Sequence, residues 1–119
     1  MGELKSARVE QALLRGAGPT AVLVLLGERE MYGYQLAQAL DERSGGVLEM
    51  GHSTLYPLLY NLEAKGLITS EERVAESGRV RRYYRLTTVG RRALKQQRAE
   101  WRSLAGALAG LGVLDPAPA

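Results

Sequence analysis

The chain has 119 residues of ordinary globular composition, 45% hydrophobic and 24% charged, with a formal net charge of +3. This length fits one compact domain with an appendage and excludes a second full core. The absence of cysteine excludes disulfides, thiol catalysis and cysteine-ligated zinc. No apolar run is long enough to span a membrane and the first ten residues hold no apolar signal core, so we expect a cytoplasmic protein.

The pattern of apolar residues in the first part of the chain predicts two helices with a break or kink between them. Apolar residues recur unevenly over residues 4–15, which indicates a short leading helix. Gly16, Gly18 and Pro19 interrupt this pattern, because proline lacks a backbone N–H and suits a first helical turn better than a helix interior. The run AVLVLL then predicts a central core helix from about Thr20 to Gly27.

Two amphipathic helices are predicted next. The first covers about Tyr32 to Arg43, and Gly45–Gly46 can supply its C-cap. The second is predicted by four leucines with helical spacing, namely Leu55, Leu58, Leu59 and Leu62, and it ends at Gly66. Pro57 leaves its start open: the helix begins three or four residues before the proline, or it begins near Gly51 and bends at the proline.

A β-hairpin follows, formed by residues 67–74 and 79–86 around the turn AESG. Alternation along the second strand places one set of side chains toward the core: Val80, Arg82, Tyr84 and Leu86. The other face carries Arg81, Tyr83 and Arg85, so Arg81 and Arg85 are expected to project toward solvent or DNA. Arg82 is a charge on the inward face, and near the strand end it can extend outward to water.

A last long helix begins at a cap formed by Thr87 or Thr88. It carries a heptad seam with one polar position: Leu94, Gln97, Trp101, Leu104, Leu108 and Leu111. We therefore divide the chain into a winged helix-turn-helix over residues 1–88, a dimerisation helix over 89–112 and a disordered tail over 113–119.

This order of elements predicts a mainly α fold with a small β-hairpin, a winged helix-turn-helix that binds double-stranded DNA. Half of the 16 lysines and arginines fall between Arg79 and Arg98 with no acidic residue among them, which favours phosphate binding. Once its leucines are buried, the third helix exposes the candidate DNA-binding residues Ser53, Thr54, Tyr56, Tyr60, Asn61 and Lys65. On the hairpin, Arg79 beside the turn is the best candidate for a minor-groove or phosphate contact, and Arg81 is a further one.

The heptad seam predicts a homodimer, because an exposed apolar stripe is buried most simply against a second copy. Two-fold pairing sets the two recognition helices about 34 Å apart and requires a palindromic operator. Trp101 either anchors the dimer core or, with Leu104 and Leu108, stacks a small aromatic ligand between the subunits.

Two other function classes, an enzyme and a protein-interaction module, fit the sequence less well. An enzyme would need a catalytic constellation, and one histidine with no cysteine and no glycine-rich phosphate loop provides none. We therefore expect no catalytic residues, no metal and no cofactor. A winged helix used only as a protein-interaction module is the alternative. Such a module would not need the cluster of arginines and lysines between Arg79 and Arg98, which we call the arginine block.

Three segments, MYGYQLAQALDERSGG, STLYPLLYNLEAKGLI and RRYYRLTTVGRRAL, resemble the PadR family of bacterial regulators. The resemblance runs from about Leu13 to Leu111, and TLYPLLYNLEAKGLI followed by YYRLT is its specific signature. It implies a homodimeric repressor whose last helix forms much of the dimer interface and which a small, often aromatic, compound releases from DNA.

The resemblance also bears on single residues. It links Tyr34, Thr54, Tyr56 and Lys65 with contacts to DNA or its backbone. The chain departs from the family where Gly-Pro and His often precede the Gly-Tyr pair, since Arg29, Glu30 and Tyr32 occupy those places. A single helix after the hairpin resembles the shorter branch of the family.

Overall fold

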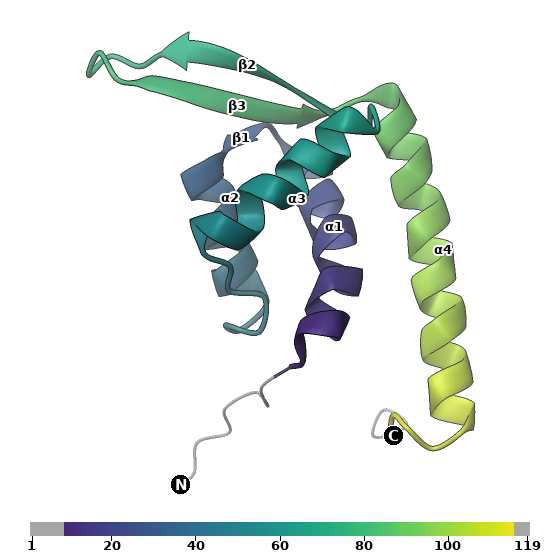
Figure 1. Cartoon of the computed structure of the whole chain (residues 1–119). Coiled ribbons are helices and arrows are strands. Elements are labelled where there is room, and N and C mark those ends of the chain that lie inside the picture. Colours follow the sequence, from purple (N-terminus) through teal and green to yellow (C-terminus); the bar gives the residue numbers. More distant parts are fainter. Residues whose placement is uncertain (1–8, 116–119) are drawn as a thin grey trace, which may run out of the picture.

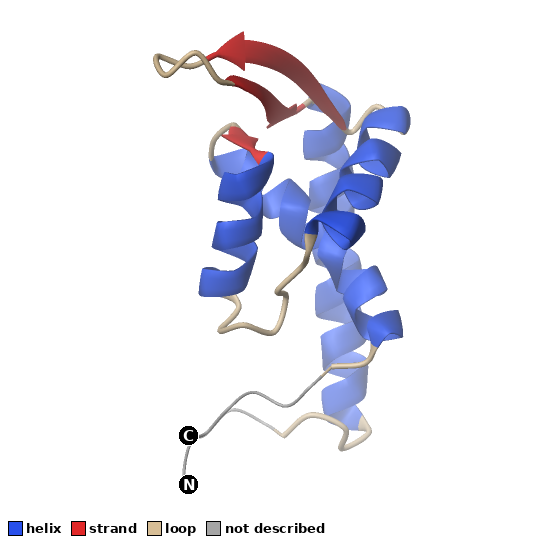
Figure 2. Cartoon of the chain, turned by 60° about the vertical axis from the view of Figure 1, so that its left-hand side comes forward, coloured by secondary structure: helices blue, strands red, loops and turns tan. Residues whose placement is uncertain are grey.

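The computed structural model describes residues 9–115, which form four helices and three strands (Figure 1). In chain order these are α1 (Gln11–Glu28), β1 (Met31–Tyr32), α2 (Gly33–Arg43), α3 (His52–Ala64), β2 (Ile68–Val74), β3 (Val80–Leu86) and α4 (Thr88–Gly110). The strands gather at one end of the molecule with the helices below them (Figure 2). The predicted winged helix-turn-helix followed by one long helix is confirmed.

The wing is a three-stranded antiparallel sheet in the order β1-β3-β2. Its β2 and β3 strands match the predicted hairpin to within one residue, and their far end projects past α2 (Figure 1). Strand β1 was not predicted, because two residues are too few to show alternation. It pairs Met31 with Tyr84 and Tyr32 with Tyr83, and so joins the start of α2 to the wing.

The predicted break in the first helical region is wrong, because α1 is one helix with Pro19 inside it. The hydrogen bond that proline cannot donate would end on the carbonyl of Arg15, an exposed residue. Gly18 serves packing, since a Cβ there would lie 2.9 Å from the Met50 side chain and 3.1 Å from Leu58. The part of the predicted leading helix before residue 9 lies outside the described residues.

Helix α3 begins at His52 with Gly51 as its N-cap, so the earlier of the two predicted starts is correct. Pro57 lies within the helix. The core joins side chains from all four helices and the sheet, namely Val22, Leu23, Leu25, Leu26, Met31, Leu36, Leu40, Leu55, Leu59, Leu62, Ile68, Tyr84, Leu86 and Leu94. Tyr84 and Leu86 therefore face the core as predicted.

Helix α4 is anchored at its start and free at its end. The Thr87 hydroxyl caps the helix by accepting a hydrogen bond from the Gly90 N–H (2.9 Å), and it donates to the Gly66 carbonyl (2.7 Å). The helix then runs beside α1 (Figure 1), and its middle is joined to that helix by hydrogen bonds of Gln97 and Trp101 with Thr20. Val113 belongs to the closing turn, since its N–H bonds to the Leu108 carbonyl (2.8 Å), so the predicted disordered tail starts too early. Residues 116–119 of that tail lie outside the described residues.

Candidate nucleic-acid interface

The exposed face of α3 is the centre of the candidate site. Its apolar stripe is turned inward, with Leu55, Leu59 and Leu62 at most 4% exposed. The other face presents to solvent the six side chains singled out from the sequence: Ser53, Thr54, Tyr56, Tyr60, Asn61 and Lys65. The predicted orientation of the helix is confirmed. Hydroxyl, amide and ammonium groups on one helix face suit phosphates and base edges.

Two tyrosines connect this face to the start of α2. The ring of Tyr56 stacks on His52 with centroids 5.4 Å apart, and its hydroxyl end lies over Gly33, where a Cβ would clash with it. Tyr34 follows Gly33 in the first turn of α2 and is 62% exposed. Tyr34 and Tyr56 are thus brought together where the start of α2 meets α3.

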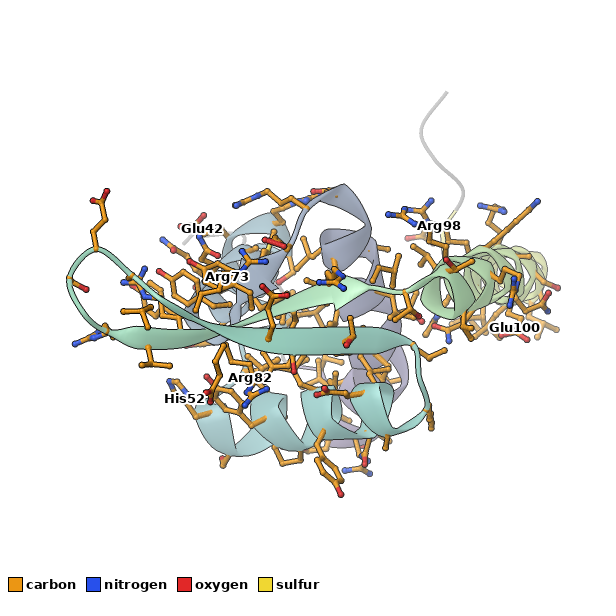
Figure 3. All side chains as sticks on the ribbon, turned by 90° about the horizontal axis from the view of Figure 1, so that it is seen from above. Glu42, His52, Arg73, Arg82, Arg98 and Glu100 are labelled. Atoms are coloured by element: carbon orange, nitrogen blue, oxygen red, sulfur yellow. The ribbon has the colours of Figure 1, made fainter. Side chains whose placement is uncertain are left out.

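The wing presents Arg82, and not Arg81, on the side of α3. Figure 3 shows Arg82 pointing toward α3 and Arg73 pointing away from it, on the opposite face of the hairpin. Arg82 donates hydrogen bonds to the Ser70 hydroxyl (3.0 Å) and the Glu72 carboxylate (2.9 Å). Arg81 shares the face of Arg73, and its guanidinium lies 4.5 Å from the centre of the Tyr32 ring. The structure therefore does not bring Arg81 together with the residues of α3.

A groove of about 510 Å³ lies between the wing and α3. Its lining consists of Tyr56, Pro57, Tyr60, Glu63, Arg82 and Tyr84. Arg82 is the residue of this site that sequence reasoning missed. Alternation assigned it correctly to the inward face, but α3 covers that face only near Tyr84, and the part toward the hairpin turn stays open.

The positive charge of the arginine block is partly neutralised. Arg82 pairs with Glu72 (2.9 Å) and Arg85 with Glu71 (3.4 Å), two acids that lie on β2 and not within the block. The pairing of β2 with β3 brings these acids beside the arginines, and a count of charges along the sequence does not show this neighbourhood. Among the residues that the structure describes, the members of the block without an ion pair are Arg79, Arg81, Arg91, Arg92, Lys95 and Arg98.

Arg79 sits at the end of the wing, as predicted. The turn is closed by hydrogen bonds from the Gly78 N–H to the Ala75 carbonyl and from the Ala75 N–H to the Arg79 carbonyl, both 2.8 Å. Gly78 has φ +86°, a conformation that favours glycine. Arg79 is exposed there, which suits a long cation that reaches a phosphate or a narrow minor groove.

The heptad seam of α4 divides into a covered part and an open part. Leu94 is buried in the chain's own core, so the prediction that it is exposed in a monomer is wrong. Thr20 of α1 donates a hydrogen bond to the Gln97 amide oxygen (2.5 Å) and accepts one from the Trp101 indole (3.2 Å). Toward the C-terminus the seam is open, with Leu104 47% and Leu111 79% exposed.

The candidate ligand residues lie at the border between these two parts. A groove of about 340 Å³ between α1 and α4 is lined by Gly16, Pro19, Thr20, Gln97, Glu100, Trp101 and Leu104. Leu108 lies one turn further along α4 and is half-buried. Over residues 9–115, no three carboxylate or imidazole groups gather as metal ligands would, and no helix has the length and apolarity to cross a membrane.

Known proteins resemble this chain in sequence and in fold. The model of the PadR-like family of transcriptional regulators matches residues 22–96. Transcriptional regulator Rv3488 of Mycobacterium tuberculosis is 43% identical over 91 residues, which cover 76% of this chain and 81% of the relative. A transcriptional regulator from Clostridium thermocellum has a TM-score of 0.77 and 29% identity, covering 84% of this chain and 97% of the other. A PadR family regulator from Eggerthella lenta has a TM-score of 0.74 and 36% identity, covering 84% and 85%.

Proposed function

The chain belongs to the PadR-like family of transcriptional regulators, DNA-binding proteins and not enzymes, and on this premise we propose how it binds DNA and how binding is controlled. We assign α3 to the major groove and the wing to the adjoining backbone or minor groove. The proposed contact residues are those predicted from the sequence, namely Tyr34, Ser53, Thr54, Tyr56, Tyr60, Asn61, Lys65, Arg79 and Arg81, together with Arg82 from the structure.

One observation carries this assignment. Helix α3 turns its leucines inward and exposes its polar and aromatic side chains, while Arg82 lies on the same side of the molecule (Figure 3). Asn61 is suited to pair with adenine through two hydrogen bonds, and Tyr60 and Lys65 are suited to phosphates. Glu63 is the one acidic residue of α3, so this helix places little negative charge near the phosphates of a duplex.

We propose that the functional form is a homodimer on a palindromic operator, as is typical of the family. Residues 1–88 would form the DNA-binding unit and residues 89–112 the dimerisation helix. The support is the open part of the seam: residues 104–114 contain no charged side chain, Leu104 and Leu108 share one face of α4, and Leu111 follows as its C-cap. Burying a leucine stabilises by roughly 1.5–3 kcal/mol, so several leucines from each copy can offset the cost of association.

We further propose that the protein is a cytoplasmic repressor and that a small aromatic compound releases it from DNA. The groove beside Trp101 and Leu104 is the candidate site, with Leu108 next to it in the open seam. An indole at the edge of a dimer interface provides a flat surface for stacking. A ligand there would contact both α1 and α4 and so would bias how the two DNA-binding units are spaced.

A gel shift with the DNA upstream of the protein's own gene, run over a series of salt concentrations, tests the DNA-binding proposal. Specific binding should weaken steeply with salt, and Arg79→Ala should lower the slope by about one unit. A wild-type protein that binds no duplex tightly would favour the alternative, a winged helix used for protein binding. Tryptophan fluorescence titration with planar aromatic compounds tests the proposed ligand site. If these compounds neither quench the fluorescence of Trp101 nor weaken operator binding, the ligand proposal is contradicted.

A further inference from the structure

The face of the wing that points away from α3 carries a cluster of interlocking side chains, which we name the wing clamp. Its members are Glu30, Tyr32, Arg73, Arg81 and Tyr83. The rings of Tyr32 and Tyr83 meet edge to face, with centroids 5.4 Å apart. Arg73 lies 4.6 Å from the centre of the Tyr83 ring, and Arg81 lies 4.5 Å from that of Tyr32. Each arginine thus covers a ring of the clamp.

Arg73 is the centre of the clamp. Its guanidinium donates two hydrogen bonds to the Glu30 carboxylate (2.5 and 2.9 Å) and a third to Glu71 (2.8 Å). The bidentate pair crosses 43 positions of sequence and joins β2 to the residue just before β1. Its hydrogen bonds hold the pKa of Glu30 below its ordinary value, so the carboxylate is charged at neutral pH.

The clamp acts where the backbone alone gives little support. Strand β1 pairs with β3 at two positions only, Met31 with Tyr84 and Tyr32 with Tyr83, and beyond them the wing projects past α2 (Figure 1). Arg73 and Arg81 stand directly opposite each other across β2 and β3, where two like charges repel. Glu30 and the rings of Tyr32 and Tyr83 offset that repulsion, so the arrangement depends in part on Glu30 and Tyr32, which lie just before α2.

We propose that the wing clamp consists of positioning residues, which fix the wing relative to the helix-turn-helix so that Arg79 and Arg82 reach DNA together with α3. This inference rests on the proposed DNA-binding function. Arg73 points away from α3 (Figure 3), so Glu30, Tyr32, Arg73 and Tyr83 act through the wing they hold and not through contact with the duplex. Arg81, which covers the Tyr32 ring, is in addition one of the proposed DNA contacts. Glu30 is the most informative member to change, because its removal makes the protein more positive.

The test compares Glu30→Gln with Glu28→Gln. Glu28 forms an ion pair of similar exposure with Arg43 (2.6 Å), which joins helices α1 and α2 and involves no residue of the hairpin. Both variants lose one negative charge, and a gain of positive charge by itself tightens DNA binding. We expect Glu30→Gln to bind the operator about two- to fivefold more weakly than Glu28→Gln, the size expected for one exposed ion pair. Hydrogen exchange of the β2 and β3 amides should be faster in Glu30→Gln alone.

A double-mutant cycle with Arg79→Ala tests whether the clamp acts through the end of the wing. The effect of Glu30→Gln should shrink once Arg79 is absent, because a loosened wing then has less contact to lose. Fully additive effects would overturn the inference, and so would equal affinity and equal wing exchange in the two glutamine variants. If the wild-type chain binds no duplex, the proposed function fails, and hydrogen exchange by itself decides whether the clamp holds the wing.

Discussion

The hydroxyl end of Tyr56 fills the space that a Cβ at Gly33 would need. This contact joins the N-terminal half of α3 to the first turn of α2. It fixes the direction of a ring that is 41% exposed on the proposed DNA-binding face.

Gly33→Ala should therefore weaken operator binding while changing the melting temperature little. An alanine suits a helix better than glycine by roughly 0.5–1 kcal/mol, which opposes the cost of displacing the Tyr56 ring. Anisotropy titration with labelled operator and a thermal melt measure the two effects. Unchanged affinity would mean that the direction of Tyr56 does not matter for DNA binding.

Leu62→Ala and Tyr60→Ala separate the core of α3 from its exposed face. Leu62 is 4% exposed and Tyr60 is 73% exposed, although they are two residues apart. Leu62→Ala should lower the free energy of unfolding by about 2–5 kcal/mol, and Tyr60→Ala should change it by less than about 0.5 kcal/mol while weakening DNA binding. Denaturant unfolding measures both variants. Equal losses of unfolding free energy in Leu62→Ala and Tyr60→Ala would contradict the orientation of the helix.

Two glycines of α4 make a matched pair for testing where this helix is anchored. A Cβ at Gly90 would collide with the Leu67 carbonyl and lie 2.7 Å from the Leu86 side chain, whereas a Cβ at Gly106 meets nothing within 4 Å. Gly90→Ala should cost about 1–3 kcal/mol of stability, as other overpacking changes do. Gly106→Ala should be neutral or stabilising by up to about 1 kcal/mol. Chemical denaturation measures both, and a stable Gly90→Ala would place the start of α4 elsewhere.

Leu111→Glu tests the proposed dimer without disturbing the core of one chain. Leu111 is 79% exposed and lies at the open end of the seam, so a charge there should prevent pairing and leave the fold intact. Val74→Glu, at a residue of the wing that is 71% exposed, is the control and should remain dimeric. Sedimentation velocity distinguishes the two states. A dimeric Leu111→Glu would show that the interface lies on another surface.

The wing clamp also predicts a dependence on pH. Hydrogen bonds from Arg73 lower the pKa values of Glu30 and Glu71 in the folded chain. A carboxylate with a lowered folded pKa stabilises the fold above its ordinary, unfolded pKa, and this contribution is lost as the pH falls through the lowered value. The melting temperature of the wild type should therefore exceed that of Glu30→Gln at neutral pH, and the difference should narrow in acid. A difference in melting temperature between the two proteins that does not change with pH would contradict the role of the Glu30 charge.

The sequence was sufficient for the elements whose signal is local. The four leucines of α3 and the alternation that turns Tyr84 inward were predicted correctly, and Thr87 is one of the two residues predicted as the cap of α4. Each of these signals depends on neighbours a few residues away. Pro19 misled the prediction, because a proline inside a helix removes one hydrogen bond without ending the helix. Helix α1 continues through it and packs Gly18 against Met50 and Leu58.

The remaining differences arise from contacts between distant parts of the chain. Leu94 fits the heptad seam as well as Leu104 does, but Leu94 is buried in the core beside Gly27 of α1, whereas Leu104 is 47% exposed. The acids on β2 that neutralise Arg82 and Arg85 lie 10 and 14 positions away and become neighbours only through strand register. Glu30 and Tyr32, which depart from the family pattern, contact the wing through Arg73 and Tyr83.

The central claim is that α3 reads a specific DNA sequence, and sequencing the duplexes that the protein selects from a random pool tests it most directly. We predict enrichment of a palindrome whose half-sites are centred about one helical turn apart, and loss of preference at symmetric positions in Asn61→Ala. A pool with no enriched sequence after selection by the wild-type protein would contradict it.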